Sequence, residues 1–458
     1  MNNTHLRVSL LLALSACTRQ EGTIGISVLA DPNSDLLSQI DKIEATYTGR
    51  DKTFSATRDD DGLSLSIDLE ADGSSGDLVF EGYTSDGARI AVGRVGPLPL
   101  AAIDAEVFVF LAPPNSITQA PVSLSVPRSH IGGTEASFGA LLVGGLGVDG
   151  PVDAVDVYST YLHTVQSGLS LPQPKSAISV SAGASGLFYL LGGADEADEA
   201  TADTLIFDTR VPPSGGYSSL AIDNEFARKG ATSAIVGEEQ FLVSGDPALF
   251  LDGFRGRVQA IPGGEGLNGQ AATVVSASGL QVVFAGANVI DPELGGVGAA
   301  VFELGEVRHV EAPEELRRLD HRAITLLSGD VLFIGGALED GTLTTSAVQY
   351  SPATQSLAQG SFAVTELLAT GRRNPAVAIT DKFLVVVGGE DADGDAIADA
   401  EVFDVRTLAP VATIPLVVAR KNATAHALGN GQILIAGGQD EAGAPTELLG
   451  LFTPDEEP

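Results

Sequence analysis

The sequence feature that most constrains the fold is an apolar segment that runs into one or two glycines and recurs seven times. The seven segments end at Gly145, Gly193, Gly245, Gly286, Gly336, Gly389 and Gly438. The steps between these glycines are 48, 52, 41, 50, 53 and 49 residues. A period near fifty residues, with room for four short strands per unit, is typical of a β-propeller in which each repeat forms one blade.

Two further markers keep step with the glycines. An aromatic residue follows each of them on a second candidate strand, at Tyr158, Phe207, Phe250, Phe302, Tyr350, Phe403 and Phe452. A basic residue precedes six of them, at Arg128, Lys175, Arg228, Arg318, Arg373 and Arg420. Three markers in register predict a repeat domain over residues 120–454.

The repeat units resemble kelch repeats, which pair a di-glycine at the end of the second strand with an aromatic on the third. Kelch blades usually carry a tryptophan as well, and this chain has none, so it resembles a divergent member. The chain ends just after the third strand of its last unit, and "APVSLSV" (120–126) has the pattern of a missing fourth strand. We therefore expect seven blades, closed by this segment so that no sheet edge stays exposed. Six blades is the alternative, because the third unit is poor.

A separate β module precedes the repeats, over residues 23–112. Seven short candidate strands lie in it, separated by turns such as "DDDG" and "ADGSSGD". This number of strands in so short a segment predicts an Ig-like β-sandwich. Residues 113–119 read as a linker. The expected fold class is all-β: a sandwich followed by a kelch-type propeller.

The amino terminus has the pattern of a secretory signal over residues 1–17. A short polar start with Arg7 leads into an apolar run too short to span a bilayer. The run ends in Leu14-Ser15-Ala16-Cys17, which resembles the lipobox of bacterial lipoproteins, in which the cysteine is acylated. Cys17 is the only cysteine, so no intramolecular disulfide can form. The resemblance implies a lipid-anchored protein of a bacterial envelope, and Thr18 favours the outer membrane. A free cysteine in an ordinary signal is the alternative.

The charge of the chain bounds its partners. A net charge of −35 repels phosphate backbones and anionic lipid headgroups, which argues against nucleic-acid binding. Solubility or a salty environment explains such a charge, and cationic partners or divalent ions are the functional alternative.

An acidic stretch, "EDADGDAIADAEVFD" (390–404), resembles a calcium loop because its carboxylates alternate around a glycine. The candidate ligands are Asp391, Asp393, Asp395 and Asp399. Counted from Asp391 as in an EF-hand, however, Ala396 stands where glycine is required and Val402 where a bidentate glutamate is required. We predict a polar turn between two strands, with Ca²⁺ as the alternative and no other cofactor.

The basic residues of the repeats fall in the crossings from one blade to the next, on the same side of the propeller as the acidic loops. They are expected to pair with those loops and hold the blades together. The alternative is a basic ring around the channel mouth that holds an anionic ligand, and the candidate ligand face is then Arg128, Lys175, Arg228, Arg318, Arg373 and Arg420.

These observations favour a binding or interaction module that presents a propeller face to a protein or glycan partner. Some kelch-like propellers are enzymes, but the copper-radical oxidases among them need a cysteine-linked tyrosine, and Cys17 is assigned to lipid. No HExxH or GxSxG pattern is present. The alternative function is a carbohydrate-active enzyme with arginine and carboxylate groups at the channel mouth.

Overall fold

The fold is all-β, as predicted from the repeat. The computed structural model describes residues 6–11, 23–49, 52–58, 75–99, 106–220, 222–267, 272–276, 281–287, 290–291, 295–296, 298–353 and 360–455. Within these ranges the helical elements are three single turns: α1 (Leu36–Gln39), η1 (Asn224–Phe226) and η3 (Glu314–Leu316).

Seven four-stranded antiparallel sheets follow one another in the part of the chain described after residue 115. Blade 1 is formed by β9 (Gly132–Ala136), β10 (Gly139–Val143), β11 (Val155–Ser159) and β12 (Thr164–Ser167). Blade 2 is formed by β13 (Ser179–Ala182), β14 (Leu187–Leu191), β15 (Thr204–Asp208) and β16 (Gly216–Leu220). Blade 3 is formed by β17 (Ser233–Gly237), β18 (Gln240–Val243), β19 (Leu249–Asp252) and β20 (Arg257–Ala260). Blade 4 is formed by β21 (Ala272–Ser276), β22 (Val282–Gly286), β25 (Gly298–Glu303) and β26 (Glu306–Glu311).

The remaining blades have the same order of strands. Blade 5 is formed by β28 (Arg322–Thr325), β29 (Val331–Ile334), β31 (Ser346–Ser351) and β32 (Ser361–Glu366). Blade 6 is formed by β33 (Ala376–Ile379), β34 (Phe383–Val387), β35 (Asp399–Asp404) and β36 (Pro410–Pro415). Blade 7 is formed by β37 (Thr424–Ala427), β38 (Ile433–Ala436), β39 (Leu448–Thr453) and β8 (Ser116–Ser123). Two short pairs lie outside the blade sheets. β23 (Ile290–Asp291) pairs with β24 (Gly295–Gly296) between the second and third strands of blade 4, and β27 (Arg318–Leu319), in the crossing into blade 5, pairs with β30 (Ala337–Leu338) after the second strand of that blade.

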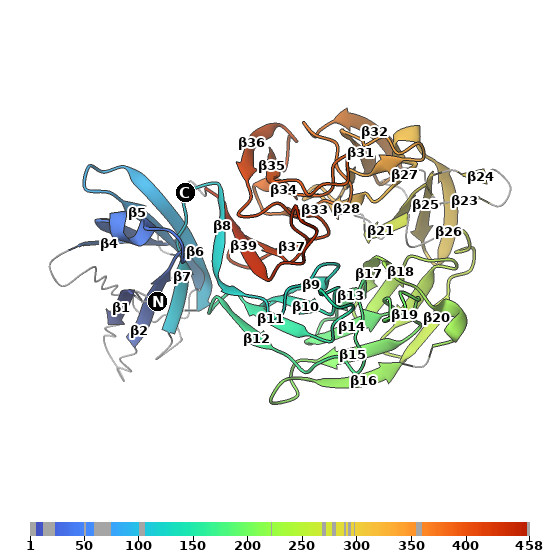
Figure 1. Cartoon of the computed structure of the whole chain (residues 1–458), viewed down its shortest axis with the longest axis horizontal. Coiled ribbons are helices and arrows are strands. Elements are labelled where there is room, and N and C mark those ends of the chain that lie inside the picture. The colour runs from blue at the N-terminus through green and yellow to red at the C-terminus, as the bar shows by residue number, and fades with distance from the viewer. Residues whose placement is uncertain are drawn as a thin grey trace.

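The seven sheets close into a ring. The first strands β9, β13, β17, β21, β28, β33 and β37 each contact the next, and β37 returns to contact β9. They surround the centre of the ring in Figure 1, with the outer strands at the periphery. The closing strand β8 pairs with β39, and Ser116 lies opposite Thr453. It starts earlier than the predicted 120, because it pairs along the whole of β39, so most of the expected linker 113–119 belongs to the propeller.

The apolar segments that defined the repeat are the second strands, and they are buried on both sides. β10, β29 and β38 are buried at every residue, since each blade packs between two neighbours; continuous apolar runs are expected for such strands. The marker aromatics all lie on third strands, and Tyr158, Phe207, Tyr350, Phe403 and Phe452 are buried. The fourth strands, such as β20 and β32, are mostly exposed.

The amino-terminal module is a two-layer sandwich. One sheet contains β1 (Leu6–Leu11), β2 (Thr23–Leu29) and β7 (Glu106–Phe110). The other contains β4 (Lys52–Thr57), β3 (Lys42–Tyr47), β5 (Ser75–Tyr83) and β6 (Arg89–Pro99). Residues of both sheets share one core, including Val28, Val109, Tyr47 and Phe80. Six of the seven predicted strands are present. The remaining one, the fourth in chain order (62–69), lies outside the described residues.

The module is fixed to the propeller. Phe110 at the end of β7 packs into a cluster that contains Tyr158 of blade 1 and Leu451 of blade 7. The Arg89 guanidinium pairs with Asp455, whose Oδ2 is 2.6 Å from Nη2. The two domains therefore meet where the propeller ring closes.

Part of the predicted signal segment is described as β1, which pairs antiparallel with β2. Cys17 lies outside the described residues, and lipidation stays a prediction. In the described part of the chain, no helix is long and apolar enough to cross a membrane.

Candidate functional site

The glycine pairs mark the points where neighbouring blades touch. The residue at the second glycine position of each blade donates its main-chain N–H to the carbonyl of the residue at the basic position of the next blade. The seven bonds run from Gly145 to Lys175, Gly193 to Arg228, Gly245 to Leu267, Ala287 to Arg318, Gly336 to Arg372, Gly389 to Arg420 and Gly438 to Arg128, at 2.7–3.1 Å. The ring of main-chain hydrogen bonds is thus complete, and Arg372, not the predicted Arg373, stands in register.

This contact also explains the first glycine of each pair. Gly388 has a φ of 53°, and a Cβ built on it would lie 2.3 Å from the Arg420 carbonyl oxygen. Gly437 has the same relation to Arg128, at 2.4 Å. A side chain at either position would therefore clash with main chain and adopt a disfavoured left-handed conformation.

The basic residues at this position point into the blades, away from solvent. Arg128, Arg318, Arg372 and Arg420 are at most 2% exposed, and Lys175 and Arg228 are also buried. Burial of five of the six predicted residues contradicts the alternative of a basic ring around the channel mouth, because a side chain inside a blade cannot meet a ligand. The sixth, Arg373, is half-buried and bonds to the Gly341 carbonyl.

Two of these arginines have buried carboxylate partners. Arg128 Nη2 lies 2.9 Å from Asp156 Oδ2, and neither side chain is exposed. Arg372 pairs with Glu401 and with Asp399. Glu401 also accepts main-chain N–H groups from Ala369 at 2.7 Å and Thr370 at 3.2 Å.

The other arginines bond to main-chain carbonyls. Arg420 donates to the carbonyls of Gly437 and Leu448 at 3.2 and 2.9 Å, and Arg318 donates to those of Gly335 and Ser346 at 2.9 Å. Burial lowers the pKa of both guanidinium groups to about 10, which leaves them charged at neutral pH. They join the second and third strands of one blade and are therefore structural.

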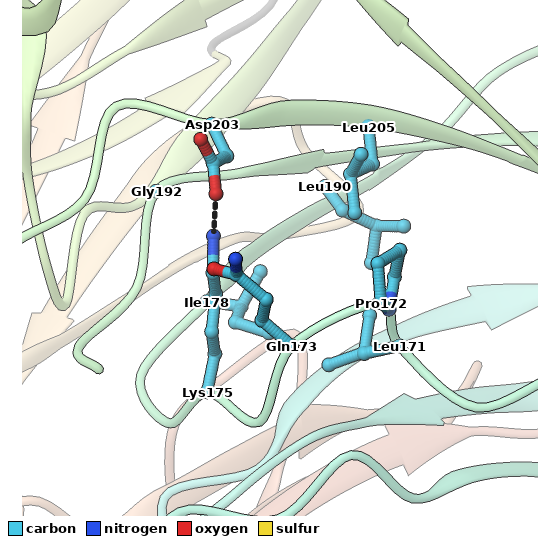
Figure 2. Close-up of a pocket in the computed structure, with 9 residues that line it drawn as sticks. All are labelled: Leu171, Pro172, Gln173, Lys175, Ile178, Leu190, Gly192, Asp203 and Leu205. Atoms are coloured by element: carbon cyan, nitrogen blue, oxygen red, sulfur yellow. Dashed lines mark hydrogen bonds and ion pairs between the residues drawn. The ribbon is translucent and has the colours of Figure 1, made fainter. Parts of the chain in front are cut away.

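Lys175 differs from the arginines at this position, because its side chain is shorter than that of arginine. It reaches Asp203 Oδ2 at 2.6 Å and Thr201 Oγ1 at 3.1 Å. Beside it lies a pocket of about 260 Å³ with walls formed by Leu171, Leu190 and other apolar side chains. Figure 2 shows the Lys175–Asp203 pair at one end of this pocket. A lysine at the position of the longer arginine thus coincides with a small space between blades 1 and 2.

In three crossings the residue after the basic position is itself basic and contacts the acidic loop of the preceding blade. Lys229 lies 2.8 Å from Asp198 Oδ2. Lys421 donates to the Gly394 carbonyl at 2.5 Å, and Arg373 donates to the Gly341 carbonyl at 3.3 Å. These half-buried cations hold the loops between second and third strands, in agreement with the predicted pairing of crossings with acidic loops.

The acidic stretch at 390–404 is a turn that its own first aspartate organises. Asp391 Oδ1 accepts the N–H groups of Asp393 and Asp395 at 3.0 and 2.9 Å, while Asp399 pairs with Arg372. The same bonds recur at Asp195 in blade 2 and Asp440 in blade 7. Asp-centred turns of this kind mimic a main-chain turn.

The four predicted metal ligands therefore do not converge. Within the described residues, no group of three or more histidine, cysteine, aspartate or glutamate side chains is placed to hold a metal ion. The predicted turn is present, and the calcium alternative lacks its ligand set.

A large cavity opens at the mouth of the central channel, on the face where crossings and acidic loops emerge. We call this the loop face, and the opposite face the turn face. The cavity encloses about 1150 Å³. Its floor comes from the starts of the first strands and is lined by small residues such as Gly132, Ser179, Thr232, Ala376 and Thr424.

The rim of the cavity is built from residues in a left-handed conformation, one in each of the six crossings that the structure describes at this position. They are His130 (φ 49°), Ala177 (50°), Gly230 (65°), Asp320 (57°), Asn374 (43°) and Asn422 (55°). Main-chain hydrogen bonds link neighbouring members, for example from Ala177 N to the His130 carbonyl at 3.1 Å and from Asn374 N to the Asp320 carbonyl at 2.8 Å. Glycine would adopt this conformation with the least strain, yet four of the six carry a polar side chain that lines the cavity.

Charged groups lie on the same rim. Burial lowers the pKa of His130, with a further decrease from Arg322 and an opposing effect of Asp198. Burial also lowers the pKa of Arg322, and Asp320 opposes that shift. Glu196 and Asp195 of blade 2 complete the acidic side of the lining.

The sequence contains a signal for these rim residues in addition to the three repeat markers. His130, Asp320, Asn374 and Asn422 each stand two residues after a basic position of the register. Histidine, aspartate and asparagine are the residues most enriched in left-handed conformations apart from glycine. The recurrence of these types at one repeat position indicates the rim.

The comparisons with known proteins supply no family. No family model matches the chain, and no curated protein matches it. A solved structure titled "Structure of YjhT" is 12% identical, with a TM-score of 0.48, over 73% of this chain and 97% of that one. The description of the fold therefore depends on the strand pairing of this chain itself.

Proposed function

We propose that this protein is a binding module whose loop-face cavity receives part of a protein or glycan partner, and that it works without catalysis. The observation that carries the proposal is the rim of the cavity. Polar side chains stand there at positions where glycine would be least strained, and strained conformations cluster at functional sites. A rigid, concave site with a few placed polar groups is the usual form of a binding pocket.

The ring of hydrogen bonds makes such a site preorganised. Each rim residue is held by main-chain bonds to the neighbouring blades, so little conformational entropy is lost when a partner binds. The cavity of about 1150 Å³ slightly exceeds the roughly 300–1,000 Å³ typical of small-ligand pockets. Its size suits an extended chain, either a peptide segment or an oligosaccharide.

The test removes rim side chains without altering the backbone. A variant with His130→Gly, Asn374→Gly and Asn422→Gly loses three polar groups from the cavity and relieves three left-handed conformations. Leu304→Gly is the matched control, because Leu304 has a φ of 53° and lies exposed in the turn between β25 and β26 on the turn face.

Both variants and the parent chain are applied to an array of short peptides and oligosaccharides. We expect the parent and Leu304→Gly to bind the same probes and the triple variant to lose them. Absence of any bound probe, or equal binding by the triple variant, would overturn the proposal.

A carbohydrate-active enzyme is the second candidate, and one observation favours it. Arg322, Asp320 and His130 line one cavity, and the positive charge of Arg322 contributes to the lowered pKa of His130. Incubation of oligosaccharides with the chain, followed by NMR, distinguishes the two functions. The binding module returns every sugar unchanged, whereas an enzyme produces a new species that Arg322→Ala abolishes.

The place of action is proposed from the sequence of the amino terminus alone. A lipid on Cys17 would hold the module at a bacterial envelope, in the outer membrane, with the propeller free to meet its partner. A Cys17→Ser variant should then leave the membrane fraction, and its retention there would contradict the anchor.

A further inference from the structure

The loops that surround the cavity carry charges of one sign. In the six second-to-third loops described throughout, at residues 144–154, 192–203, 244–248, 335–345, 388–398 and 437–447, every ionisable residue is an aspartate or a glutamate. Most of these side chains are exposed, among them Asp149, Asp153, Glu196, Asp198, Glu199, Asp246, Glu339, Asp393 and Glu441. The loop face is therefore strongly acidic at its surface.

The basic residues of the crossings do not offset this surface charge at the mouth. Those at the register position are buried in the blades and bond to carboxylates or carbonyls below the surface. Lys229 is 26% exposed and directed at Asp198, which is itself 83% exposed. A partner approaching the loop face meets carboxylates before it meets any of these cations.

The cavity lining repeats the imbalance. Its acidic residues are Asp195, Glu196, Asp198 and Asp320, and its lysine and arginine residues are Lys229 and Arg322. Lys229 is engaged with Asp198, and the negative charge of Asp320, two residues before Arg322, acts on the Arg322 guanidinium. A concave site of low dielectric concentrates the field of such charges and raises the local concentration of the opposite charge.

We propose that the occupant of the loop-face cavity is a cationic segment of a partner protein, an exposed stretch that carries several lysine or arginine side chains. This inference rests on the proposed binding function and names the chemistry of the ligand. The small floor residues leave room for long side-chain stems, and the rim asparagines supply amide groups to an extended backbone. Charge complementarity of this kind determines which partners associate and how fast.

Other ligand classes fit less well. A bare divalent ion lacks a converging set of ligands among the described residues. A neutral oligosaccharide gains nothing from the acidic field, and an acidic one is repelled by it.

The experiment measures binding of hexa-lysine to the full chain by titration calorimetry, with hexa-(Nε-acetyl-lysine) as the uncharged probe of the same backbone. We expect hexa-lysine to bind, the acetylated peptide to bind at least about tenfold more weakly, and the affinity for hexa-lysine to fall with added salt. A neutral hexasaccharide is titrated in parallel.

Two variants locate the site. Glu196→Gln with Asp320→Asn removes two carboxylates from the cavity, and asparagine already occupies the position of Asp320 in blades 6 and 7. Glu306→Gln with Asp381→Asn makes the same change of charge on the turn face, where both residues are exposed. We expect the first variant to weaken hexa-lysine binding by about tenfold and the second by less than about twofold.

Each outcome decides something. Equal weakening by both variants would overturn the inference, because it would show attraction to the whole acidic surface. Binding of the neutral hexasaccharide in preference to hexa-lysine, lost in the triple glycine variant, would overturn the cationic partner and leave the binding function standing. Binding of no probe, with the triple glycine variant indistinguishable from the parent, would overturn both.

Discussion

Two sets of charged residues meet on the loop face, and burial gives them different roles. Arg372 lies inside blade 6 with no exposed side-chain surface, whereas Asp399, one of its partners, is 38% exposed. Across the propeller the basic residues at the register position of the crossings are buried, whereas most carboxylates of the acidic loops are exposed. A charged side chain that points into a blade therefore stabilises the fold, and one that points to solvent contributes to the binding surface.

The largest expected effect comes from removing a framework charge. Arg372→Ala should lower the free energy of unfolding by about 3–5 kcal/mol, because Glu401 then stays buried without its cation. Arg373→Ala, one residue away and half-buried, should cost less than about 1 kcal/mol. Urea unfolding of both variants measures the difference, and equal losses would break the distinction between the two positions.

Protonation of buried histidines should destabilise the fold at low pH. Burial lowers the pKa of both His163 and His426 to about 4 in the folded chain, below the ordinary value of about 6.5. The unfolded chain then binds more protons than the folded one, so stability falls as the pH decreases from about 6.5 to 4. The loss approaches about 3 kcal/mol for each residue.

A His426→Gln variant isolates this contribution from that of the carboxylates, which also titrate in acid. It should lose less stability than the parent between pH 7 and pH 4.5, measured by chemical unfolding at both values. Parallel losses in the two proteins would show that His426 titrates normally.

Within the acidic turn, the same contrast between a structural and an exposed carboxylate is expected to have a smaller effect on the free energy of unfolding. Asp391→Ala removes the acceptor of two main-chain N–H groups and should cost about 1 kcal/mol, while Asp393→Ala should be nearly neutral. Thermal melts of the parent in Ca²⁺ and in chelator should coincide. A difference of roughly 2–4 °C that Asp393→Ala abolishes would instead reveal a metal site.

The smallest expected effect is at the surface. Lys229→Ala removes an ion pair whose aspartate is mostly exposed, and such pairs contribute about 0–1 kcal/mol. The change in unfolding free energy should be close to the error of the measurement. A loss of unfolding free energy as large as that of Arg372→Ala would mean that the half-buried cations that contact the acidic loops also stabilise the fold.

Much of this architecture could be predicted from the sequence, because the repeat places the same constraint in every blade. The glycine at 388 is required by a carbonyl of the next blade, and the aromatics at 350 and 403 fill the space between sheets, so their spacing indicates the ring. The closing strand starts at Ser116, before the predicted 120. The alternation of 120–126 resembles a strand more than the polar 116–119 does.

The site was harder to predict, because the direction of a side chain does not follow from its position in the repeat. The basic marker falls in a crossing, and a crossing can turn its side chains outward or into the blade. Arg420 turns inward, where it reaches three carbonyl groups of its own blade. The rim residue Asn422 lines the cavity from a left-handed backbone position, and the basic marker of the repeat does not indicate that conformation.

The most direct test of the account is the dissociation constant of hexa-lysine for two single variants, Lys175→Met and Asp320→Asn. Methionine extends the apolar wall beside Lys175 and leaves Asp203 mostly exposed, so the fold should tolerate it. The account predicts weakening by several-fold for Asp320→Asn and a change within about twofold for Lys175→Met. Tighter binding by Lys175→Met, as large as the loss in Asp320→Asn, would show that the basic crossings do face the ligand and would contradict the account.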